Sequence, residues 1–411
     1  MKIDAIIPLL KNLLNTTRIL DTLAWYLLSL MIPSSKHSQT FAAEISGKNH
    51  SLFSDLLQKD SGFSLLTLNR ASRRRLKKLM RKRKAIEKGA PWTIGIIIDA
   101  TIHERSSRHL ENAQIFNLGK GFVVGHKWTN IGLWVAGQYV PLPPISFYTR
   151  EECEIRGIEY KTEHEKVVNF LRTYSLKSLD KNIDASKIVV LLDAGYDSKQ
   201  IQNTIISRKW DFICSLKSDR NCSSEPMEWY RVDKYFEDGR RPWKTIRIAS
   251  YCGRKKYLRQ FQIKHREGYL KGVRLRVKLV CSKRSRDKKK KHLACSNLTV
   301  STKMILLAYK YRWKIEVFHR DIKSFLGLED AGVKYFNSLH NHVHWVYVAY
   351  NLLLEKFPDE TVRGAQIKLT KELEIKEKKK ALQIISRING VAQLKSSFQS
   401  AIHKIELTNA A

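Results

Sequence analysis

Two aspartates in this chain stand at corresponding places in two apolar segments. Asp99 ends the β-branched run of residues 92–99, and Asp193 ends the run of residues 187–193. Small residues follow both aspartates, so the two carboxylates can approach each other at the end of a sheet. A single aspartate in such a place is usually a turn former or a helix cap, but two close carboxylates repel and are stabilised by a shared metal cation. The pattern therefore predicts a metal site, with a structural role for each aspartate as the alternative.

A third carboxylate lies in a segment of helical periodicity. If this segment is one α-helix, a sector of about 60° on its surface carries four residues with polar groups: Tyr309, Arg312, Glu316 and Lys323. An ordinary solvated face has the same pattern, with Arg312 and Glu316 as an i,i+4 ion pair worth about 0.3–0.5 kcal/mol. Periodicity alone favours that solvated face.

Taken together, the two aspartates and this helical face carry a resemblance to a known family. They resemble the DDE triad and the Tyr-x2-Arg-x3-Glu-x6-Lys (YREK) signature of bacterial insertion-sequence transposases, and the surrounding residues YRWKIEVFHRDIK are similar as well. The similarity extends over residues 92–330. It implies a ribonuclease H-like catalytic domain with a β-rich insertion between the second aspartate and the glutamate.

The resemblance also implies a role for each carboxylate. Asp99, Asp193 and Glu316 would be the catalytic residues and would hold two metal ions, with Asp99 bridging both. We expect Mg²⁺, with Mn²⁺ as a substitute, because hard carboxylate oxygens suit these ions and leave positions open for phosphate and water. Tyr196 and Asp197, which follow the second aspartate as in the family, would support the site.

Several basic and aromatic residues are candidate DNA contacts. Arg312 and Lys323 would contact phosphates near the cleaved bond, and Tyr309 would pack or hydrogen-bond against the same backbone. Trp313 lies beside this face, where it would either stack on a flipped base or pack in the core. Lys217 follows an expected strand and is a second candidate for a phosphate contact, with an ordinary surface lysine as the alternative.

The composition points to a polyanionic partner. The 411 residues include 75 Lys and Arg against 39 Asp and Glu, so the formal net charge is +36. Such a field attracts nucleic acids or anionic membranes and argues against a small-metabolite enzyme with a neutral surface. The longest uncharged N-terminal run, residues 22–35, is shorter than the about 20 residues that cross a bilayer. The charge alone does not distinguish DNA from RNA, but the resemblance implies double-stranded DNA as the partner, and we expect no membrane.

Much of the positive charge lies in two short segments, residues 70–84 and residues 283–291. The first segment includes five residues that we expect to contact DNA phosphates: Arg73, Arg74, Arg75, Lys77 and Lys78. For any one of them, a place in a solvated basic linker is the alternative. The second segment has the composition of an exposed loop. Both segments are predicted to bind DNA outside the active site.

The order of the expected elements indicates an α/β fold with several parts. Strands alternate with helices in the middle of the chain, which is typical of a mixed sheet covered by helices. Two short helices joined at Gly47 are compatible with a helix-turn-helix near the N-terminus. The expected parts are a helical, basic DNA-binding region at 1–90, a ribonuclease H-like catalytic domain at 91–218 and 298–335, a β-rich insertion at 219–297, and a helical C-terminal region at 336–411 that could serve dimerisation.

These features together predict a DNA transposase. The expected reaction is metal-dependent cleavage at the transposon ends, followed by transfer of the released 3′-hydroxyls into target DNA. Two alternatives stay open: a ribonuclease H-like nuclease without strand transfer, and a transposase-derived protein that binds DNA without cutting it. The resemblance implies a homodimer in a synaptic complex with the terminal inverted repeats. Six cysteines without a CxxC pair fit the reducing bacterial cytoplasm, where the protein would associate with the nucleoid.

Overall fold

The chain divides into two compact units. In the computed structural model, a helical unit comprises Met1–Ala71 and Arg320–Ala411, and a sheet unit comprises Ser72–His319. Two long helices, α5 (Ser61–Ile86) and α11 (Trp313–Phe325), contribute residues to both units. The division at residues 90, 218, 297 and 335 that the sequence suggests stays a prediction. The structure describes residues 7–11, 13, 19–86, 90–105, 109–117, 119, 121–237, 242–252, 255–284, 289–388 and 402.

The helical unit is built around one buried helix, α12 (Phe336–Lys356). This helix is apolar on most of its surface, as expected for a helix that is surrounded by others. Two of its histidines are paired within the unit, since His342 Nδ1 lies 2.7 Å from the Tyr26 hydroxyl and His344 Nδ1 lies 2.8 Å from Ser64 Oγ. The other helices of this unit are α1 (Ile7–Lys11), α2 (Leu20–Met31), α3 (Gln39–Ser46), α4 (His50–Gln58) and α13 (Val362–Ile388).

The short turn between α3 and α4 has the features that the sequence predicts. Gly47 adopts a left-handed conformation with φ of +67° and ends α3, a conformation that favours glycine. The side chain of Asn49 accepts a hydrogen bond from the amide of Ser51 and caps α4. The two helices expected on either side of the glycine are confirmed, while their DNA-binding role stays a prediction.

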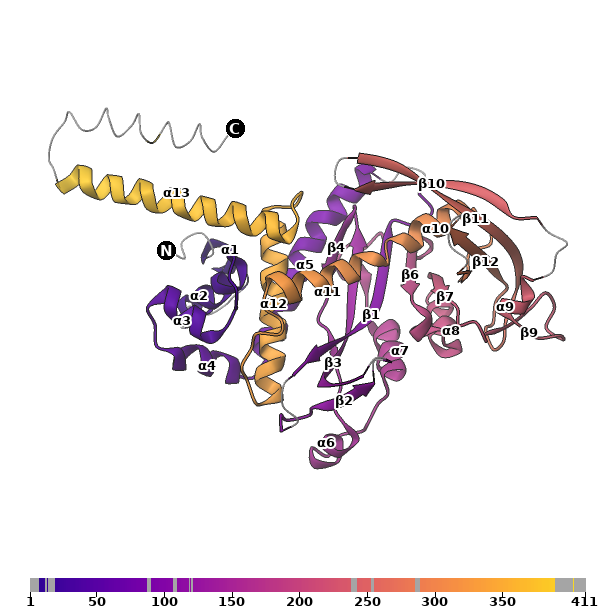
Figure 1. Cartoon of the computed structure of the whole chain (residues 1–411), viewed down its shortest axis with the longest axis horizontal. Coiled ribbons are helices and arrows are strands. Elements are labelled where there is room, and N and C mark those ends of the chain that lie inside the picture. The colour runs from indigo at the N-terminus through magenta and orange to yellow at the C-terminus, as the bar shows by residue number, and fades with distance from the viewer. Residues whose placement is uncertain are drawn as a thin grey trace. The chain divides into compact units, whose positions relative to one another are not determined.

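The sheet unit is organised around one mixed sheet, with 13 strands in the described part of the chain (Figure 1). The order is β2-β3-β1-β6-β7-β13-β12-β11-β8-β9, with β4 and β5 paired to β3 and β10 paired to β11. The pairs β1–β6 and β6–β7 are parallel and the other described pairs are antiparallel. The strands are β1 (Ile94–Glu104), β2 (Gln114–Asn117), β3 (Phe122–Val135), β4 (Gln138–Pro141), β5 (Ile145–Ser146), β6 (Ile188–Leu192), β7 (Asp211–Ser215), β8 (Asn221–Ser223), β9 (Tyr230–Arg231), β10 (Lys244–Cys252), β11 (Lys255–Leu270), β12 (Val277–Arg284) and β13 (Lys291–Cys295).

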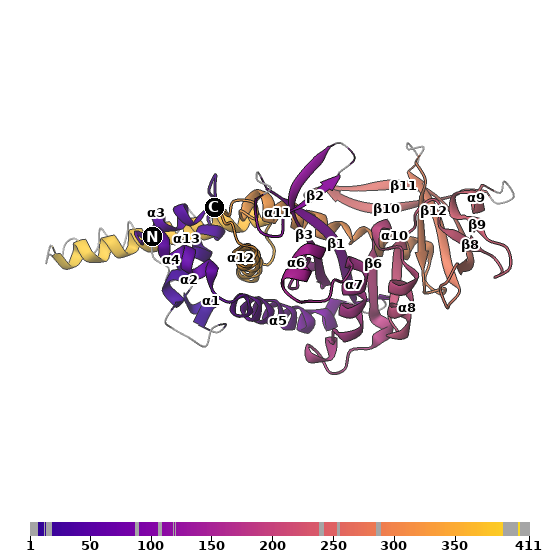
Figure 2. The same ribbon diagram turned by 90° about the horizontal axis from the view of Figure 1, so that it is seen from below.

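The two faces of the sheet are covered by different helices. Alternate residues of β1, namely Ile94, Ile96 and Ile98, pack in an apolar cluster with residues of α5, α7 (Glu163–Thr173) and α8 (Lys199–Ser207). Figure 2 shows these helices along one side of the sheet. On the other side, α10 (Thr302–Lys310) and the beginning of α11 cross β1 and β6 (Figure 1). Two short helices, α6 (Arg150–Ile155) and α9 (Val232–Tyr235), lie between strands in the sequence.

Two of the expected strands differ in length from the observed ones. The sequence pattern predicts two separate strands at residues 121–125 and 130–136. In the structure β3 is continuous, and its residues 125–135 pair with the whole of β1. For the same reason β1 does not end at Asp99 and continues to Glu104. Antiparallel pairing satisfies the backbone groups of both strands through these polar positions, which the apolar pattern alone does not predict.

The β-rich insertion continues the central sheet. Its last strand, β13, pairs with β7 in antiparallel fashion, with Leu293 opposite Ser215. The basic run at 283–291 is not a loop at its two ends, because Lys283 lies in β12 and Lys291 opens β13. Residues 285–288 of this run lie outside the described residues. The expectation of one exposed loop is therefore wrong at both ends of the run, where β12 and β13 pair.

The observed arrangement is a mixed α/β fold with helices on both faces of the sheet. It is consistent with a ribonuclease H-like fold, and the predicted fold class is confirmed. None of the helices that the structure describes combines the length and the apolar character needed to cross a membrane.

Candidate active site

The register of the sheet places Asp99 and Asp193 next to each other. Ile98 of β1 pairs in parallel with Leu192 of β6, and each aspartate is the following residue. Paired residues of parallel strands point to the same face, and neighbouring strands lie about 4.8 Å apart. Because Ile98 and Leu192 both pack in the apolar cluster, Asp99 and Asp193 point to the opposite face, where α10 and α11 lie.

A tight turn holds the carboxylate of Asp193. Its Oδ1 accepts a hydrogen bond of 2.8 Å from the amide of Gly195, and a Cβ at position 195 would lie only 3.1 Å from the same oxygen. Glycine therefore permits this close approach. The carboxylate of Asp197, a predicted supporting residue, is 1% exposed and accepts a hydrogen bond of 3.3 Å from the amide of Lys217. This contact ties the turn to the end of β7.

Tyr196, the other predicted supporting residue, is held by the beginning of α7. Its hydroxyl donates a 2.7 Å hydrogen bond to Glu163 Oε1, and the same carboxylate accepts hydrogen bonds of 2.5 Å from Lys127 and Thr129 of β3. Burial would raise the pKa of Glu163, but these hydrogen bonds lower it below its usual value. Glu163 thus links the turn after Asp193 to β3. The sequence pattern does not single out Glu163, because its partners are distant in sequence.

Glu316 reaches the site from an interrupted helix. The sequence predicts one continuous helix, but α10 and α11 are separated by Tyr311 and Arg312, whose amides bond the carbonyls three residues earlier at 2.9 and 3.1 Å. Such bonds are typical of a tighter 3-10 turn. The Tyr311 ring stacks on Trp134 of β3 at 3.9 Å between centroids and packs the interruption against the sheet. The prediction of a single helix is therefore wrong, and the interruption places Arg312 between the two helices.

Arg312 joins two of the three predicted catalytic carboxylates. Its Nη1 donates to Asp99 Oδ2 at 3.3 Å, its Nη2 donates to Glu316 Oε1, and its side chain is only 13% exposed. Burial raises the pKa of Asp99 to about 6 against the lowering effect of Arg312, and the charges of Asp193 and Glu316 raise it further. The three carboxylates therefore form one electrostatic cluster that Arg312 partly neutralises.

The carboxylate cluster fits divalent metal ions by its chemistry. Three carboxylates supply the hard oxygen donors that Mg²⁺ and Mn²⁺ prefer. Burial is the main cause of the raised pKa of Asp99, and repulsion from Asp193 and Glu316, which a bound cation would offset, adds to it. Within the described residues, no three His, Cys, Asp or Glu side chains already converge as metal ligands do. The cation found among these carboxylates is the guanidinium of Arg312.

Two polar residues beside the carboxylates are not evident from the sequence. Asn130 of β3 is the cross-strand partner of Asp99 and is fully buried, and its Nδ2 lies 2.7 Å from His319 Nε2. His319 follows Glu316 by three residues and therefore lies on the same side of α11. This contact fastens the glutamate-bearing turn of the helix to the strand beside Asp99.

A lysine from the insertion also lies at this site. The ammonium of Lys291 is 4.6 Å from the centre of the Tyr309 ring, and Tyr309 is only 8% exposed. Desolvation and Arg312 lower the pKa of Lys291, while Glu316 and Asp193 raise it. The expectation that this basic run binds DNA only outside the active site is therefore wrong for Lys291. The pairing of β13 with β7 explains its position.

The remaining predicted contacts near the site differ in exposure. Trp313 is 61% exposed, so the alternative that it packs in the core is wrong. Lys217 is exposed at the end of the β7 segment. Lys323 lies on the part of α11 that belongs to the helical unit, where its Nζ pairs with Glu329 at 2.6 Å. A contact of each of these residues with DNA stays a proposal.

The predicted DNA contacts of α5 fall into two groups. Arg75 is 3% exposed and donates to Gln138 Oε1 at 3.1 Å, so it is part of the fold, and Arg74 is half-buried. Arg73 is exposed and donates to the carbonyl oxygen of Ser178 at 3.0 Å. The exposed residues Lys77 and Lys78 remain candidates for phosphate contacts. We no longer expect Arg75 to contact DNA, because the sheet unit buries it.

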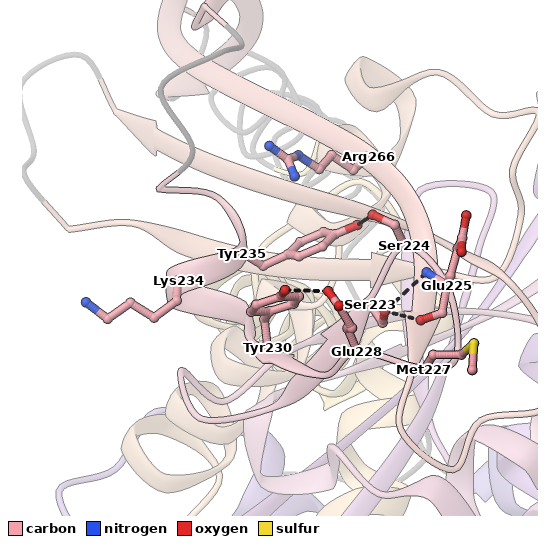
Figure 3. Close-up of a pocket in the computed structure, with 9 residues that line it drawn as sticks. All are labelled: Ser223, Ser224, Glu225, Met227, Glu228, Tyr230, Lys234, Tyr235 and Arg266. Carbon is pink, nitrogen blue, oxygen red and sulfur yellow. Dashed lines mark hydrogen bonds between the residues drawn. The ribbon is translucent and has the colours of Figure 1, made fainter.

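A separate cavity of about 520 Å³ lies in the β-rich insertion (Figure 3). None of the predicted catalytic residues lines it. Polar groups of its lining bond to one another: Tyr230 donates to Glu228 at 2.6 Å, and Ser224 bonds the Tyr235 hydroxyl at 2.7 Å. This cavity is therefore not the site formed by Asp99, Asp193 and Glu316. Its lining comprises Ser223, Ser224, Glu225, Met227, Glu228, Tyr230, Lys234, Tyr235 and Arg266.

Comparison with known families agrees with the chemistry of this site. Residues 152–352 match the family described as "Transposase DDE domain". The matched segment includes Asp193, Arg312 and Glu316, whereas Asp99 precedes it. No curated protein matches the chain. Residues 152–352 therefore resemble the DDE domain of transposases, which is consistent with an insertion-sequence DDE transposase.

Proposed function

We propose that this protein is a DNA transposase that cleaves DNA at the ends of its element and joins the released 3′-hydroxyls to target DNA. The observation that carries the proposal is the adjacency of Asp99 and Asp193 on parallel strands, with Glu316 linked to Asp99 through Arg312. A half-buried cluster of carboxylates beside exposed basic and aromatic side chains suits phosphodiester chemistry.

Each carboxylate has a proposed role. Asp99, Asp193 and Glu316 would hold divalent Mg²⁺ ions, for which Mn²⁺ would substitute. When bound, such ions activate a water or a 3′-hydroxyl and stabilise the leaving oxygen. Glu163 and Tyr196 support the turn that presents Asp193, through the hydrogen bond between them.

Other residues bind the substrate in this proposal. Arg312 exchanges its carboxylate partners for a phosphate beside the cleaved bond, since a guanidinium binds both groups with the same geometry. Lys323 and Lys217 contact further phosphates, Tyr309 packs beneath them, and the exposed indole of Trp313 stacks on an unpaired base at the element's end.

The partner is double-stranded DNA, both the terminal inverted repeats and the target. The net charge of +36 supports this choice, because the counterions released from DNA by many basic residues favour binding. We further propose that the protein acts as a homodimer in a synaptic complex and works at the bacterial nucleoid.

The experiment that tests this function is a strand-transfer assay with Mg²⁺. The substrate is DNA that carries the inverted repeats flanking the coding region, together with a target plasmid. Joined products are expected. Cleavage without joining would instead identify a ribonuclease H-like nuclease, and binding without cleavage would identify a non-catalytic protein derived from a transposase.

A further inference from the structure

Lys291 enters the sheet at the same edge as the catalytic aspartates. The carboxyl ends of the parallel strands β6 and β7 define that edge, and Asp193 follows β6 directly. Because β13 is antiparallel to β7, it begins where β7 ends, with Leu293 opposite Ser215 and the carbonyl oxygen of His292 2.9 Å from the amide of Leu216. The first residue of β13, Lys291, therefore lies beside the carboxylates although it belongs to the insertion.

The side chain of Lys291 is oriented by Tyr309. Its ammonium lies 4.6 Å from the centre of the Tyr309 ring, a cation–π contact that holds the charge in place. Tyr309 lies in the last turn of α10, three residues before Arg312. The ammonium also interacts electrostatically with two carboxylates, Glu316 of α11 and Asp193 after β6. Lys291 is thus directed at the reaction centre from the insertion.

The partners of Lys291 leave its positive charge available. In the part of the chain that the structure describes, Lys291 forms no ion pair within 4.0 Å, and its side chain is exposed. Its neighbour Lys290 is also exposed but lies 4.0 Å from Glu237 instead. A lysine beside a carboxylate cluster cannot be a metal ligand while it is charged, but it can bind the anion that approaches the cluster.

We propose that the ammonium of Lys291 binds a non-bridging oxygen of the DNA phosphate next to the cleaved bond and so positions the strand over the three carboxylates. This inference rests on the proposed transposase function. It adds a substrate-binding residue that comes from the insertion, near Arg312. It also gives the insertion a direct part in positioning the cleaved strand.

The test compares two lysines that carry the same charge in the same strand region. Lys291→Met removes the ammonium but keeps an unbranched side chain over Tyr309. Lys290→Met is the matched control, because a DNA contact outside the active site affects affinity, and saturating DNA compensates for a loss of affinity. At saturating DNA, Lys291→Met is expected to lower the single-turnover cleavage rate by about 10- to 100-fold, the range for a charged hydrogen bond, and Lys290→Met by about twofold or less. Lys291→Arg, which keeps the charge, should retain most of the rate.

A second measurement identifies the phosphate. DNA with one neutral methylphosphonate next to the cleaved bond should lower the wild-type rate by about the same 10- to 100-fold and leave Lys291→Met almost unaffected, because the contact is already missing. Equal losses in Lys291→Met and Lys290→Met, or equal sensitivity of wild type and Lys291→Met to the neutral phosphate, would overturn the inference alone. If the wild-type protein does not cleave DNA with Mg²⁺, the proposed function fails, and this inference with it.

Discussion

Ile98 and Asp99 are neighbours in β1 but point into opposite environments. Ile98 is fully buried in the apolar cluster on the face covered by α5, α7 and α8. Asp99 points to the face covered by α10 and α11, where burial and two further carboxylates raise its pKa to about 6. One strand therefore has a face that stabilises the fold and a face that holds charge at a cost in stability.

The difference between the two faces separates structure from chemistry. Apolar side chains on the first face gain free energy simply by leaving water. On the second face, the half-buried carboxylate of Asp99 loses solvation and is repelled by Asp193 and Glu316, and Arg312 offsets only part of this. Carboxylates that lie close together despite this cost in stability are typical of a reaction site.

The same comparison explains the two basic segments. From Ser72 onward, α5 packs Leu76, Leu79 and Met80 into the apolar cluster, so Arg75 of this helix is buried as part of the fold. Lys291 comes from the other segment and lies at the charged face. Basic residues of these segments therefore have two different roles. On the apolar face they are part of the fold, as Arg75 is, and on the charged face they lie beside the carboxylates, as Lys291 does.

The largest expected effects come from the charged face. Asp193→Asn and Glu316→Gln should each lower the rate of DNA cleavage with Mg²⁺ by about 1,000-fold or more, because groups that act as one unit fail together. DNA binding, measured by a mobility shift at fixed salt, should be retained. More than a few per cent of wild-type cleavage by either variant would contradict a catalytic role for that carboxylate.

The apolar face should respond in the opposite way. Ile98→Ala removes buried methyl groups, so the free energy of unfolding should fall by about 2–5 kcal/mol, while Ile98→Val should lower it by about 0.5–1.5 kcal/mol. The measurement is denaturant unfolding, together with a cleavage rate normalised to the folded fraction. The rate per folded molecule should stay close to wild type. A normalised rate as low as that of Asp193→Asn would remove the distinction between the faces.

Glu163 stands between the two cases, since its carboxylate stabilises the turn beside the site. Its pKa in the folded protein lies below the usual 4.5, so its charged form stabilises the fold above pH 4.5. This contribution is lost as the pH falls through the folded-state pKa. The free energy of unfolding of Glu163→Gln should therefore be lower than that of wild type at pH 7, and the difference should shrink on acidification.

The measurement is urea unfolding of both proteins between pH 7 and pH 3, analysed as the difference between them. Taking the difference removes the contributions of the other carboxylates. Tyr196→Phe is the matched control, since it deletes one of the hydrogen bonds to Glu163 and keeps the charge. A difference that does not change with pH would show that Glu163 does not depend on its charge.

The smallest effects are expected on α5. Lys77→Ala and Lys78→Ala should change the free energy of unfolding by about 0.5 kcal/mol or less, and each should reduce the slope of log affinity against log salt by about 1 if it contacts a phosphate. Arg75→Ala should instead destabilise the fold by about 1–3 kcal/mol, because it leaves Gln138 without this partner. Titrations of DNA at several salt concentrations distinguish the two groups, and a salt slope that changes only in Arg75→Ala would reverse the assignment.

Much of the fold follows from short-range patterns. The apolar runs that end in Asp99 and Asp193 predict two buried strands, because hydrophobic side chains in strands and their polar ends are local features. The sequence patterns of residues 337–354 and 361–388 also predict two helices, and they agree with α12 and α13 to within a few residues. The carboxylates of the candidate site follow from the same patterns together with the resemblance to a known family.

Other parts depend on contacts between distant residues and do not follow from local patterns. The interruption between α10 and α11 is packed by the stacking of Tyr311 on Trp134, and helix periodicity does not predict it. The position of Lys291 depends on the pairing of β13 with β7. Similarly, Glu163 gains its importance from Tyr196 and two residues of β3. Because lysine and glutamate are usually on the surface, the sequence alone does not place Lys291 and Glu163 at the site. Their positions depend on how the strands pair and pack.

The central claim is that Asp99, Asp193 and Glu316 hold divalent metal ions at one site. Replacing Mg²⁺ with Fe²⁺ in the DNA complex and adding ascorbate and peroxide generates radicals that cut the polypeptide next to the bound ion. The account predicts cuts near residues 99, 193 and 316 that excess Mg²⁺ suppresses. Cuts that lie elsewhere, for example around the cavity at residues 223–235, or that Mg²⁺ does not suppress, would contradict it.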